Sequence, residues 1–212
     1  MRDQHCHILW GVDDGAATWD DTLAMLAAAK EAGVDRMVCT PHLRWDDFDE
    51  GVVRSRFAQF KEHSADAGVT AELGFEVYYK TLLKRGLDCA PRYCLDGTNQ
   101  LLLEFNSGGE IPFGWEQTVD KLRNVYGLDV TIAHPERYST AWKDFDAVYQ
   151  LKDAGCSLQV SAMDLEGGFL SKPTKVAKRM MKEGLCDALV SDAHRAEHYA
   201  RFAKMTSRFG TP

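Results

Sequence analysis

Strand-like and helix-like segments alternate along the whole chain, and this alternation limits the folds open to it more than any other feature. The expected strands are short, mostly apolar runs around His5 and at 34–40, 69–79, 100–105, 128–133, 156–161 and 188–191. The run 69–79 is one strand, or two joined at Gly74. The expected helices begin after Thr18 as N-cap and lie near 52–67, 115–126, 145–154, 176–184 and 195–208. Strand–helix units with short links require parallel strands and right-handed crossovers. With about seven strands, we expect one α/β domain over residues 1–212, folded as a closed or nearly closed barrel.

Acidic residues outnumber basic ones, 32 to 25, which gives a formal net charge of −7. A protein that binds a nucleic-acid backbone needs a basic stripe, so no nucleic-acid partner is expected. Cations bound by some of the acids would neutralise part of this charge. The chain has no basic-then-apolar leader and no apolar run near the length of a membrane span. We therefore expect a cytoplasmic protein without membrane insertion.

The six cysteines are scattered through apolar runs, and no C-x-x-C pair occurs. This pattern is typical of reduced, buried thiols and not of a disulfide framework. No cysteine has an arginine six positions later, so the C-x5-R phosphate loop of cysteine-dependent phosphatases is absent. Phosphatase chemistry of that class is excluded.

His5 and His7 stand two apart in the first strand-like run. Side chains alternate along a strand, so both imidazoles point to one face, at a Cα spacing of roughly 6.5–7 Å. Asp13 and Asp14 follow in a turn closed by Gly15, and spacing alone does not choose between the two carboxylates. For an isolated H-x-H, the simpler interpretation is an edge strand with two hydrogen-bonded histidines.

The rest of the chain favours a functional site over that simpler interpretation, because nearly every expected strand ends near a His, Asp or Glu. In a parallel barrel these ends meet at one rim, where the active sites of such barrels lie. Glu104 is the clearest case, because a carboxylate after three leucines costs several kcal/mol if it is buried without a partner. Imidazole and carboxylate together are ligands for Zn, Fe or Mn, so the sequence predicts a metal site. The rim candidates are His5, His7, His42, Glu76, Glu104, His134, Asp192 and His194.

Five motifs carry a family resemblance: H-C-H-I-L-x-G-V-D-D-G at 5–15, T-P-H at 40–42, L-L-E-F at 102–105, A-H-P-E-R at 133–137 and S-D-A-H at 191–194. Their order resembles that of PHP-domain proteins, most closely the capsule-type, CpsB/YwqE-like tyrosine phosphatases of bacteria. The resemblance implies a distorted seven-stranded β/α barrel with three divalent metal ions, Mn, Fe or Zn, of which Mn is favoured. The implied ligands are His5, His7, Asp14, His42, Glu76, Glu104, His134, Asp192 and His194. Asp13 is then expected to orient a ligand histidine from behind.

The resemblance also makes Arg137 the phosphate-binding and catalytic arginine. A further family arginine, five residues after the last ligand histidine, is replaced here by Tyr199. Arg195 and Arg201 flank that position, and we expect Arg195 to bind substrate. Three aromatic residues near the rim, Trp45, Phe113 and Trp115, either stack on a substrate ring or anchor their loops.

The predicted function is a metal-dependent protein-tyrosine phosphatase that uses a metal-bridged hydroxide as nucleophile. Tyrosinate, with a pKa of about 10, leaves more readily than an alkoxide and needs less acid assistance. The resemblance implies a phosphotyrosine protein as substrate, the tyrosine-rich tail of a bacterial kinase of capsule or exopolysaccharide biosynthesis. Two alternatives remain: a small-molecule phosphomonoesterase similar to histidinol-phosphate phosphatase, and a catalytically weak metal-binding regulatory module. The sequence leaves the oligomeric state open, including a homo-oligomer.

Overall fold

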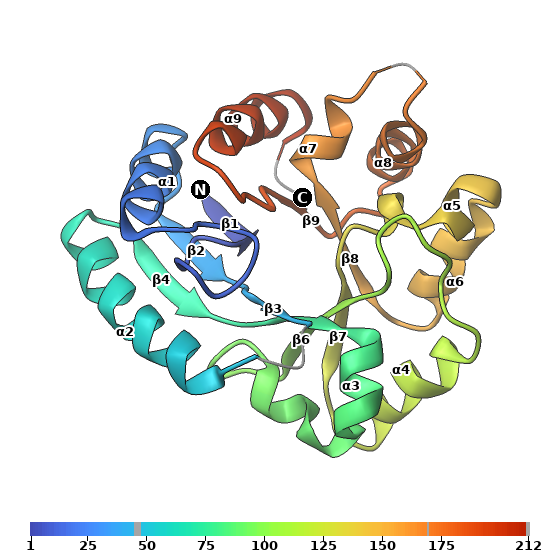
Figure 1. Ribbon diagram of the computed structural model, residues 1–212. Helices are drawn as coiled ribbons and strands as arrows, with labels where there is room; N and C mark the ends of the chain where they lie inside the picture. Colours follow the sequence, from blue (N-terminus) through green and yellow to red (C-terminus); the bar gives the residue numbers. More distant parts are fainter. Residues whose placement is uncertain (45–47, 169, 211–212) are drawn as a thin grey trace.

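The computed structural model describes residues 1–44, 48–168 and 170–210. Its parallel strands form a curled wall, and helices cover the outside of that wall (Figure 1). The strands of the described residues are β1 Arg2–Cys6, β2 Arg36–Cys39, β3 His42–Leu43, β4 Thr70–Leu73, β5 Glu76–Tyr78, β6 Gln100–Glu104, β7 Asp129–Ile132, β8 Ser157–Ser161 and β9 Ala188–Val190. A three-stranded sheet has the order β1-β2-β4, and a six-stranded sheet has the order β3-β5-β6-β7-β8-β9. This curled parallel sheet confirms the predicted α/β, barrel-like class.

Two expected strand segments are followed or interrupted by a break. The run 34–40 contains β2, and β3 follows it after Thr40 and Pro41. The run 69–79 forms the two-strand alternative, β4 and β5, separated by Gly74 and Phe75. Proline has no N–H to donate to a ladder, and glycine weakens a strand, so each break has a local cause. The breaks lie side by side and divide the wall into its two sheets. Seven expected strand segments therefore give a larger number of shorter strands.

The helices of the described residues are α1 Trp19–Glu31, α2 Glu50–Asp66, α3 Tyr79–Arg85, α4 Trp115–Asn124, α5 Ser139–Lys143, α6 Asp146–Asp153, α7 Ala162–Leu165, α8 Lys172–Lys182 and α9 Glu197–Phe209, with 3-10 turns η1 Leu87–Tyr93 and η2 Pro135–Arg137. Thr18 caps α1 as predicted, and Asp21 completes a capping box with it. Helices α3, α5 and α7 were not predicted, because one or two turns are too short to show a 3.6-residue period. No helix of the described segments is both long and apolar enough to cross a bilayer.

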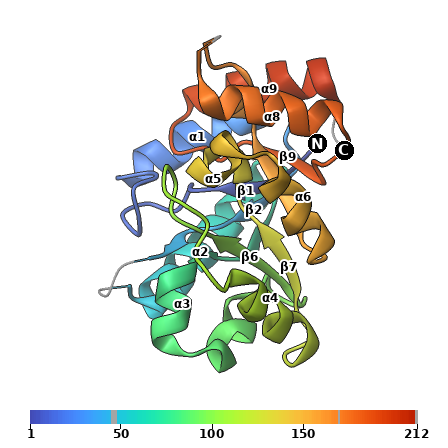
Figure 2. The same ribbon diagram turned by 90° about the vertical axis from the view of Figure 1, so that its right-hand side faces the viewer.

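Helices wrap the strands in the second view as well (Figure 2). Buried apolar residues of both strands and helices form one core. Tyr138 is fully buried, and its hydroxyl donates to Ala133 O at 2.6 Å and accepts from Phe105 N at 3.1 Å. This one side chain ties the segment after β7 to the end of β6. The loops that leave neighbouring strands are therefore fixed from inside the core.

The barrel closes between its first and last strands through a buried carboxylate. Asp3 Oδ1 accepts from Ser191 N at 3.0 Å, and Asp3 Oδ2 accepts from Ser191 Oγ at 2.6 Å. Two backbone bonds continue the contact, from His7 N to Ala193 O and from Asp192 N to His5 O, both at 2.9 Å. Asp3 has no exposed surface. The closure thus fixes the segment that carries Asp192 against the segment that carries His5 and His7.

We predict that Asp3→Ala lowers the free energy of unfolding by about 2–3 kcal/mol, because it leaves the Ser191 N–H and hydroxyl buried without their acceptor. Urea unfolding monitored by tryptophan fluorescence measures this change. Asp35→Ala is the control: Asp35 is exposed and pairs with the N-terminal amine at 2.9 Å, so its loss should cost about 1 kcal/mol or less. Equal losses in the two variants would contradict the closure role.

Asp3 also makes stability depend on pH. Burial raises the pKa of Asp3 from 3.8 to about 6, so between these values the folded chain holds a proton that the unfolded chain has released. The contribution is present below pH 4 and is lost as the pH rises through 6. The difference in unfolding free energy between wild type and Asp3→Asn should fall by up to about 3 kcal/mol between pH 4 and pH 7, measured without metal. A pH-independent difference would refute this assignment.

Candidate metal centre

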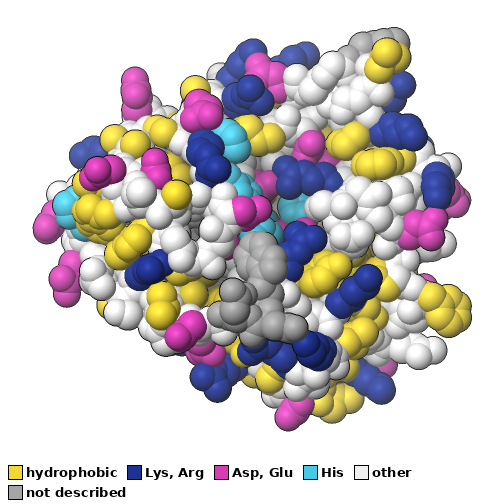
Figure 3. Space-filling view, in the orientation of Figure 1, with side chains coloured by type: hydrophobic (Ala, Val, Ile, Leu, Met, Phe, Trp, Pro, Cys, Tyr) yellow, Lys and Arg dark blue, Asp and Glu magenta, His cyan; other side chains and the backbone are white. Residues whose placement is uncertain are grey.

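The rim residues expected from the sequence converge at one rim of the barrel. His5 lies one residue before the end of β1, and Glu104 ends β6. His42 and Glu76 begin β3 and β5, just past the ends of β2 and β4. The others lie in the segments that follow β1, β7 and β9: His7 and Asp14, His134, and Asp192 with His194. Figure 3 shows histidine side chains in a hollow on this face, with Lys and Arg side chains around it.

Three groups of these side chains place ligand atoms within 4.8 Å of one another, as metal sites require. They are His5 with His7 and Asp192; His42 with Glu76 and Glu104; and His7 with Asp14, His42 and His194. The groups overlap, because His7 and His42 each belong to two of them. His134 stands outside these groups but contacts Glu76. All nine predicted ligands are therefore brought to one place.

Glu76 is the centre of the cluster. Its Oε1 lies 2.8 Å from His134 Nε2, and its Oε2 lies 3.1 Å from His5 Nε2 and 3.0 Å from His42 Nδ1. His7 Nε2 is 3.3 Å from the same Oε2. The carboxylate has no exposed surface. One buried acid thus lies among four imidazoles that come from three separate segments of the chain.

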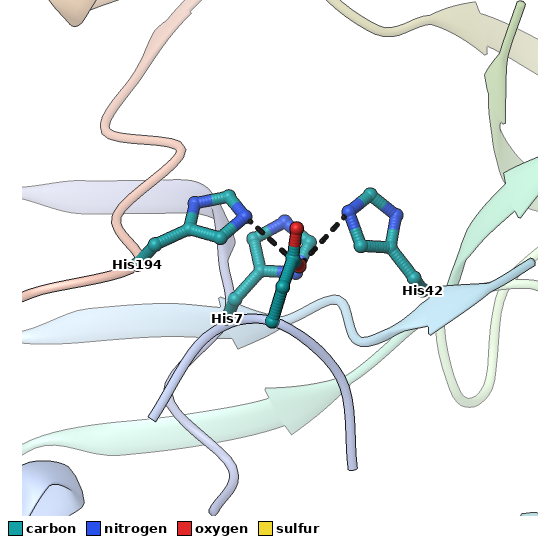
Figure 4. A group of neighbouring side chains, drawn as sticks. His7, His42 and His194 are labelled. Atoms are coloured by element: carbon teal, nitrogen blue, oxygen red, sulfur yellow. Dashed lines mark ion pairs between the residues drawn. The ribbon is translucent and has the colours of Figure 1, made fainter. Parts of the chain in front are cut away.

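The outer group lies at the mouth of the hollow. The rings of His7, His42 and His194 face a shared carboxylate in Figure 4. This acid is Asp14, whose Oδ1 is 3.4 Å from His194 Nε2 and 3.5 Å from His42 Nε2. The Asp14 side chain is 61% exposed, so this end of the cluster is open to a substrate. The His194 interaction lowers the pKa of Asp14 well below its usual range.

Asp13 makes the contact that was predicted for it. Its Oδ2 lies 2.8 Å from His7 Nδ1 and accepts from His42 N at 3.1 Å, and its Oδ1 accepts from Gly15 N at 2.9 Å. This arrangement directs His7 Nε2 toward the cluster and fixes the ring. The structure therefore separates two adjacent aspartates that the spacing could not separate.

Two ligand candidates occupy an unfavourable backbone conformation. His134 has φ 32° and Asp192 has φ 48°, and no other non-glycine residue of the described chain has a positive φ. Such conformations cost of order 1–3 kcal/mol and persist where the surroundings over-determine them, most often at functional sites. Here they turn the two side chains from the ends of β7 and β9 into the hollow.

The electrostatics of the cluster fit bound cations. Burial, and then the charge of Glu76, raises the pKa of Glu104 to about 8, while burial lowers the pKa of His42 to about 4. Burial also opposes ionisation of Glu76, but the His5 and His42 imidazoles hold its pKa well below the usual range. Glu76 Oε2 and Glu104 Oε2 are buried and accept no hydrogen bond from the described residues. Nitrogen and oxygen donors with these unused lone pairs match Mn, Fe or Zn.

Arg137 reaches the edge of the cluster. Its Nη2 is 2.7 Å from Asp192 Oδ2 and 3.1 Å from Ser161 Oγ, and its Nε is 2.6 Å from Asp164 Oδ2. Although burial opposes the charge, Asp192 and Asp164 raise the pKa of Arg137. Sequence reasoning missed Asp164 and Ser161 as partners. Ser161 ends a predicted strand, but the strand-end rule considered only His, Asp and Glu. Asp164 lies in the one-turn α7 and gave no signal.

The residues around the replaced family arginine, Arg195, Tyr199 and Arg201, differ in what they contact. Arg195 Nη1 donates to the carbonyl oxygens of Asp14 at 3.1 Å, Gly15 at 2.7 Å and His194 at 2.6 Å. It therefore links the loop that carries Asp14 to the loop that carries His194. Arg201 points to the residue that follows α7, where its Nε is 3.7 Å from Glu166 Oε2. Tyr199 is fully buried in the core. The substrate role of Arg195 stays a prediction.

The aromatic residues near the rim differ in exposure. Trp115 is buried and anchors the start of α4, whereas Phe113 is fully exposed. Trp45 lies outside the described residues.

Comparison with known proteins agrees with this geometry. A family model described as capsular polysaccharide synthesis, CpsB/CapC, matches residues 1–208. The chain belongs to the CpsB/CapC family. It is 28% identical to the tyrosine-protein phosphatase YwqE of Bacillus subtilis, over 92% of this chain and 77% of that protein. It is 27% identical to the tyrosine-protein phosphatase CpsB of Streptococcus agalactiae, over 92% of this chain and 83% of that protein.

A crystal structure from work on YwqE of Bacillus subtilis and CpsB of Streptococcus pneumoniae, described as metal-dependent tyrosine phosphatases, has a similar fold. It superposes with a TM-score of 0.85 and 27% sequence identity, and the match covers all of this chain and 88% of that one. The fold and the family of this CpsB/CapC chain are therefore established independently of its ligand set.

We predict that Mn²⁺ stabilises this protein and that Glu76→Gln removes most of the effect. At a free concentration of 100 times Kd, one bound ion adds about 2.7 kcal/mol, or roughly 5–10 °C in Tm for a chain of this size. Thermal unfolding with and without chelator, together with elemental analysis, measures both quantities. Glu72→Gln, which changes a carboxylate of β4 paired with Arg2 and Arg36, is the control and should keep the full metal-dependent shift. A wild-type shift in Glu76→Gln would contradict the assignment.

Proposed function

We propose that this protein is a metal-dependent protein-tyrosine phosphatase that hydrolyses phosphotyrosine in protein substrates. The observation that carries the proposal is the set of overlapping imidazole–carboxylate groups with the Arg137 guanidinium at its edge. Membership of the CpsB/CapC family and similarity to named tyrosine-protein phosphatases support it.

The residues would hold three divalent ions, with Mn favoured. His5, His7 and Asp192 form one side of the cluster, His42, Glu76 and Glu104 form another, and Asp14 with His194 forms the open end; His134 adds a nitrogen beside Glu76. When bound, the ions lower the pKa of water toward about 7 and offset charge on the phosphoryl group. The lone pairs of Glu76 Oε2 and Glu104 Oε2 would then be used.

Arg137 binds the phosphoryl group in this proposal. Its Nε and Nη2 are held by Asp164 and Ser161, so the plane of the guanidinium is fixed before substrate arrives. The guanidinium, held in this orientation, directs its remaining N–H groups to the phosphoryl oxygens and stabilises the charge that develops during transfer. Asp13 keeps the His7 ring oriented throughout. Because tyrosinate has a pKa of about 10, its departure needs little help from a general acid.

The open end of the cluster suits a phosphotyrosine carried on a flexible protein segment. Asp14 and Arg195 are exposed there, and Arg195 is proposed as a contact for the substrate. The description of the family, capsular polysaccharide synthesis, supports a substrate in that process. We propose the tyrosine-rich tail of a bacterial tyrosine kinase of capsule or exopolysaccharide biosynthesis, which implies a cytoplasmic site of action.

We predict that Arg137→Ala lowers kcat on p-nitrophenyl phosphate by roughly 10²–10³-fold, because a fixed donor to the transition state is lost. Arg137→Lys should recover only a small part of the lost kcat, since an ammonium cannot keep the contacts with Asp164 and Ser161 that orient the guanidinium. Steady-state kinetics with Mn²⁺ measures both, and elemental analysis verifies that the variants still bind metal. Arg179→Ala, a change on the outer face of α8, is the control and should be as active as the wild type.

The same assay separates the proposed function from its alternatives. A phosphotyrosine peptide should be turned over with a higher kcat/KM than histidinol phosphate, and a chelator should abolish turnover of both. Activity that survives complete metal removal would refute the metal-dependent mechanism. Preference for histidinol phosphate would refute the substrate assignment alone.

A further inference from the structure

Arg44 is a second arginine at the metal centre, and neither the sequence motifs nor the proposed mechanism uses it. It follows β3 directly, two residues after His42. Its Nη1 lies 3.9 Å from Glu104 Oε2, and its side chain is 32% exposed. A cationic group therefore borders the buried carboxylate of β6 and also reaches the surface of the hollow.

The position of Arg44 is set from two sides. The guanidinium carbon lies 4.7 Å from the centre of the Tyr78 ring, in a cation–π contact. Tyr78 ends β5 and pairs in register with Glu104, so the ring stands beside the acid that Arg44 approaches. The Arg44 carbonyl oxygen accepts from Thr81 Oγ1 at 2.8 Å. A guanidinium that lies on an aromatic face keeps its N–H groups at the edge, where they can bind an anion.

The contact with Glu104 does not use up these donors. A separation of 3.9 Å is an ion pair and not a hydrogen bond, so Glu104 attracts Arg44 without taking an N–H. This differs from Arg137, whose Nε and Nη2 make short contacts with Asp164 and Asp192. Arg195 differs from Arg44 as well, because its Nη1 already donates hydrogen bonds to three loop carbonyls.

The two arginines border the cluster at different ligands. Arg44 lies beside Glu104, which belongs to the group with His42, and Arg137 lies beside Asp192, which belongs to the group with His5 and His7. A phosphoryl group above the cluster would have one guanidinium toward each of these groups. A phosphomonoester dianion has three non-bridging oxygens. One arginine does not contact all three, so a second arginine can bind an oxygen that the first leaves without a donor.

We propose that Arg44 is a further substrate-binding residue, which binds a phosphoryl oxygen of the phosphomonoester dianion from the Glu104 side of the centre. The inference rests on the proposed phosphatase function and adds a specific residue to it. Arg44 is partly exposed and not hydrogen-bonded to Glu104, so its contact forms when the substrate binds. It therefore contributes to KM more than to kcat, whereas Arg137 contributes to kcat.

The test compares Arg44→Ala, Arg44→Lys, Tyr78→Phe and Tyr78→Ala with the wild type. With Mn²⁺ bound, Arg44→Ala should raise KM for p-nitrophenyl phosphate and the Kd of inorganic phosphate, measured by calorimetry, by about tenfold or more. Its kcat should stay within about threefold. Arg44→Lys keeps a charge but loses the planar fork, so it should recover only part of the affinity. Tyr78→Ala should raise KM by a smaller factor, and Tyr78→Phe, which keeps the ring face, should not.

The matched control is Arg36→Ala. Arg36 begins β2 at the opposite end of the barrel and also pairs with a glutamate, Glu72, at 3.2 Å. Its removal should leave KM and phosphate affinity unchanged. Metal content and Tm are measured for every variant, because Arg44 could act only by holding Glu104.

The outcomes separate the two proposals. If the wild type turns over substrate and Arg44→Ala has the wild-type KM and phosphate affinity, the inference about Arg44 is overturned. Loss of bound metal in Arg44→Ala, with normal phosphate affinity in metal-saturated protein, also overturns it. If the wild type shows no metal-dependent turnover, the phosphatase function fails, and phosphate calorimetry still decides whether Arg44 binds the anion.

Discussion

The burial of Glu76 among imidazoles is the constraint on which the rest of the rim depends. A fully buried carboxylate is expensive unless charge or hydrogen bonds compensate it. Here the compensation comes from His5, His42 and His134, within 2.8–3.1 Å of its two oxygens. These histidines belong to strands or strand ends far apart in the sequence. The acid and its neighbours can therefore be satisfied only when the wall of the barrel is complete.

The contact that closes the barrel also positions part of the ligand cluster. Asp3 and Ser191 join β1 to the end of β9, and the next residues on each side include His5 and Asp192. Asp192 takes a positive φ immediately after this contact. The hydrogen bonds of the closure hold that strained turn in place and thereby fix the position of Asp192 in the cluster.

The arginines near the centre are held in different ways. Arg137 is held by Asp164 and Ser161, which supports the proposal that it stabilises a transition state. Arg195 fixes backbone carbonyls of the loops that carry Asp14 and His194. Arg44 is supported on an aromatic ring and not bonded to the acid beside it. The three arginines are thus differently constrained, and their positions in the sequence do not show these contacts.

The sequence by itself determined the class of fold and the set of rim residues, because strand–helix alternation and strand-end positions are local properties that the chain records directly. It also located the α1 cap at Thr18 and, through family motifs, preferred Asp14 to Asp13. Only the tertiary structure decided which histidine Asp13 supports, that Tyr199 is a core residue, and that Asp164 and Tyr78 hold Arg137 and Arg44. These are contacts between side chains on separate elements, and their distances depend on how the strands curl and where Pro41 and Gly74 divide them. No periodicity in the sequence encodes such distances, because they arise only when the wall closes.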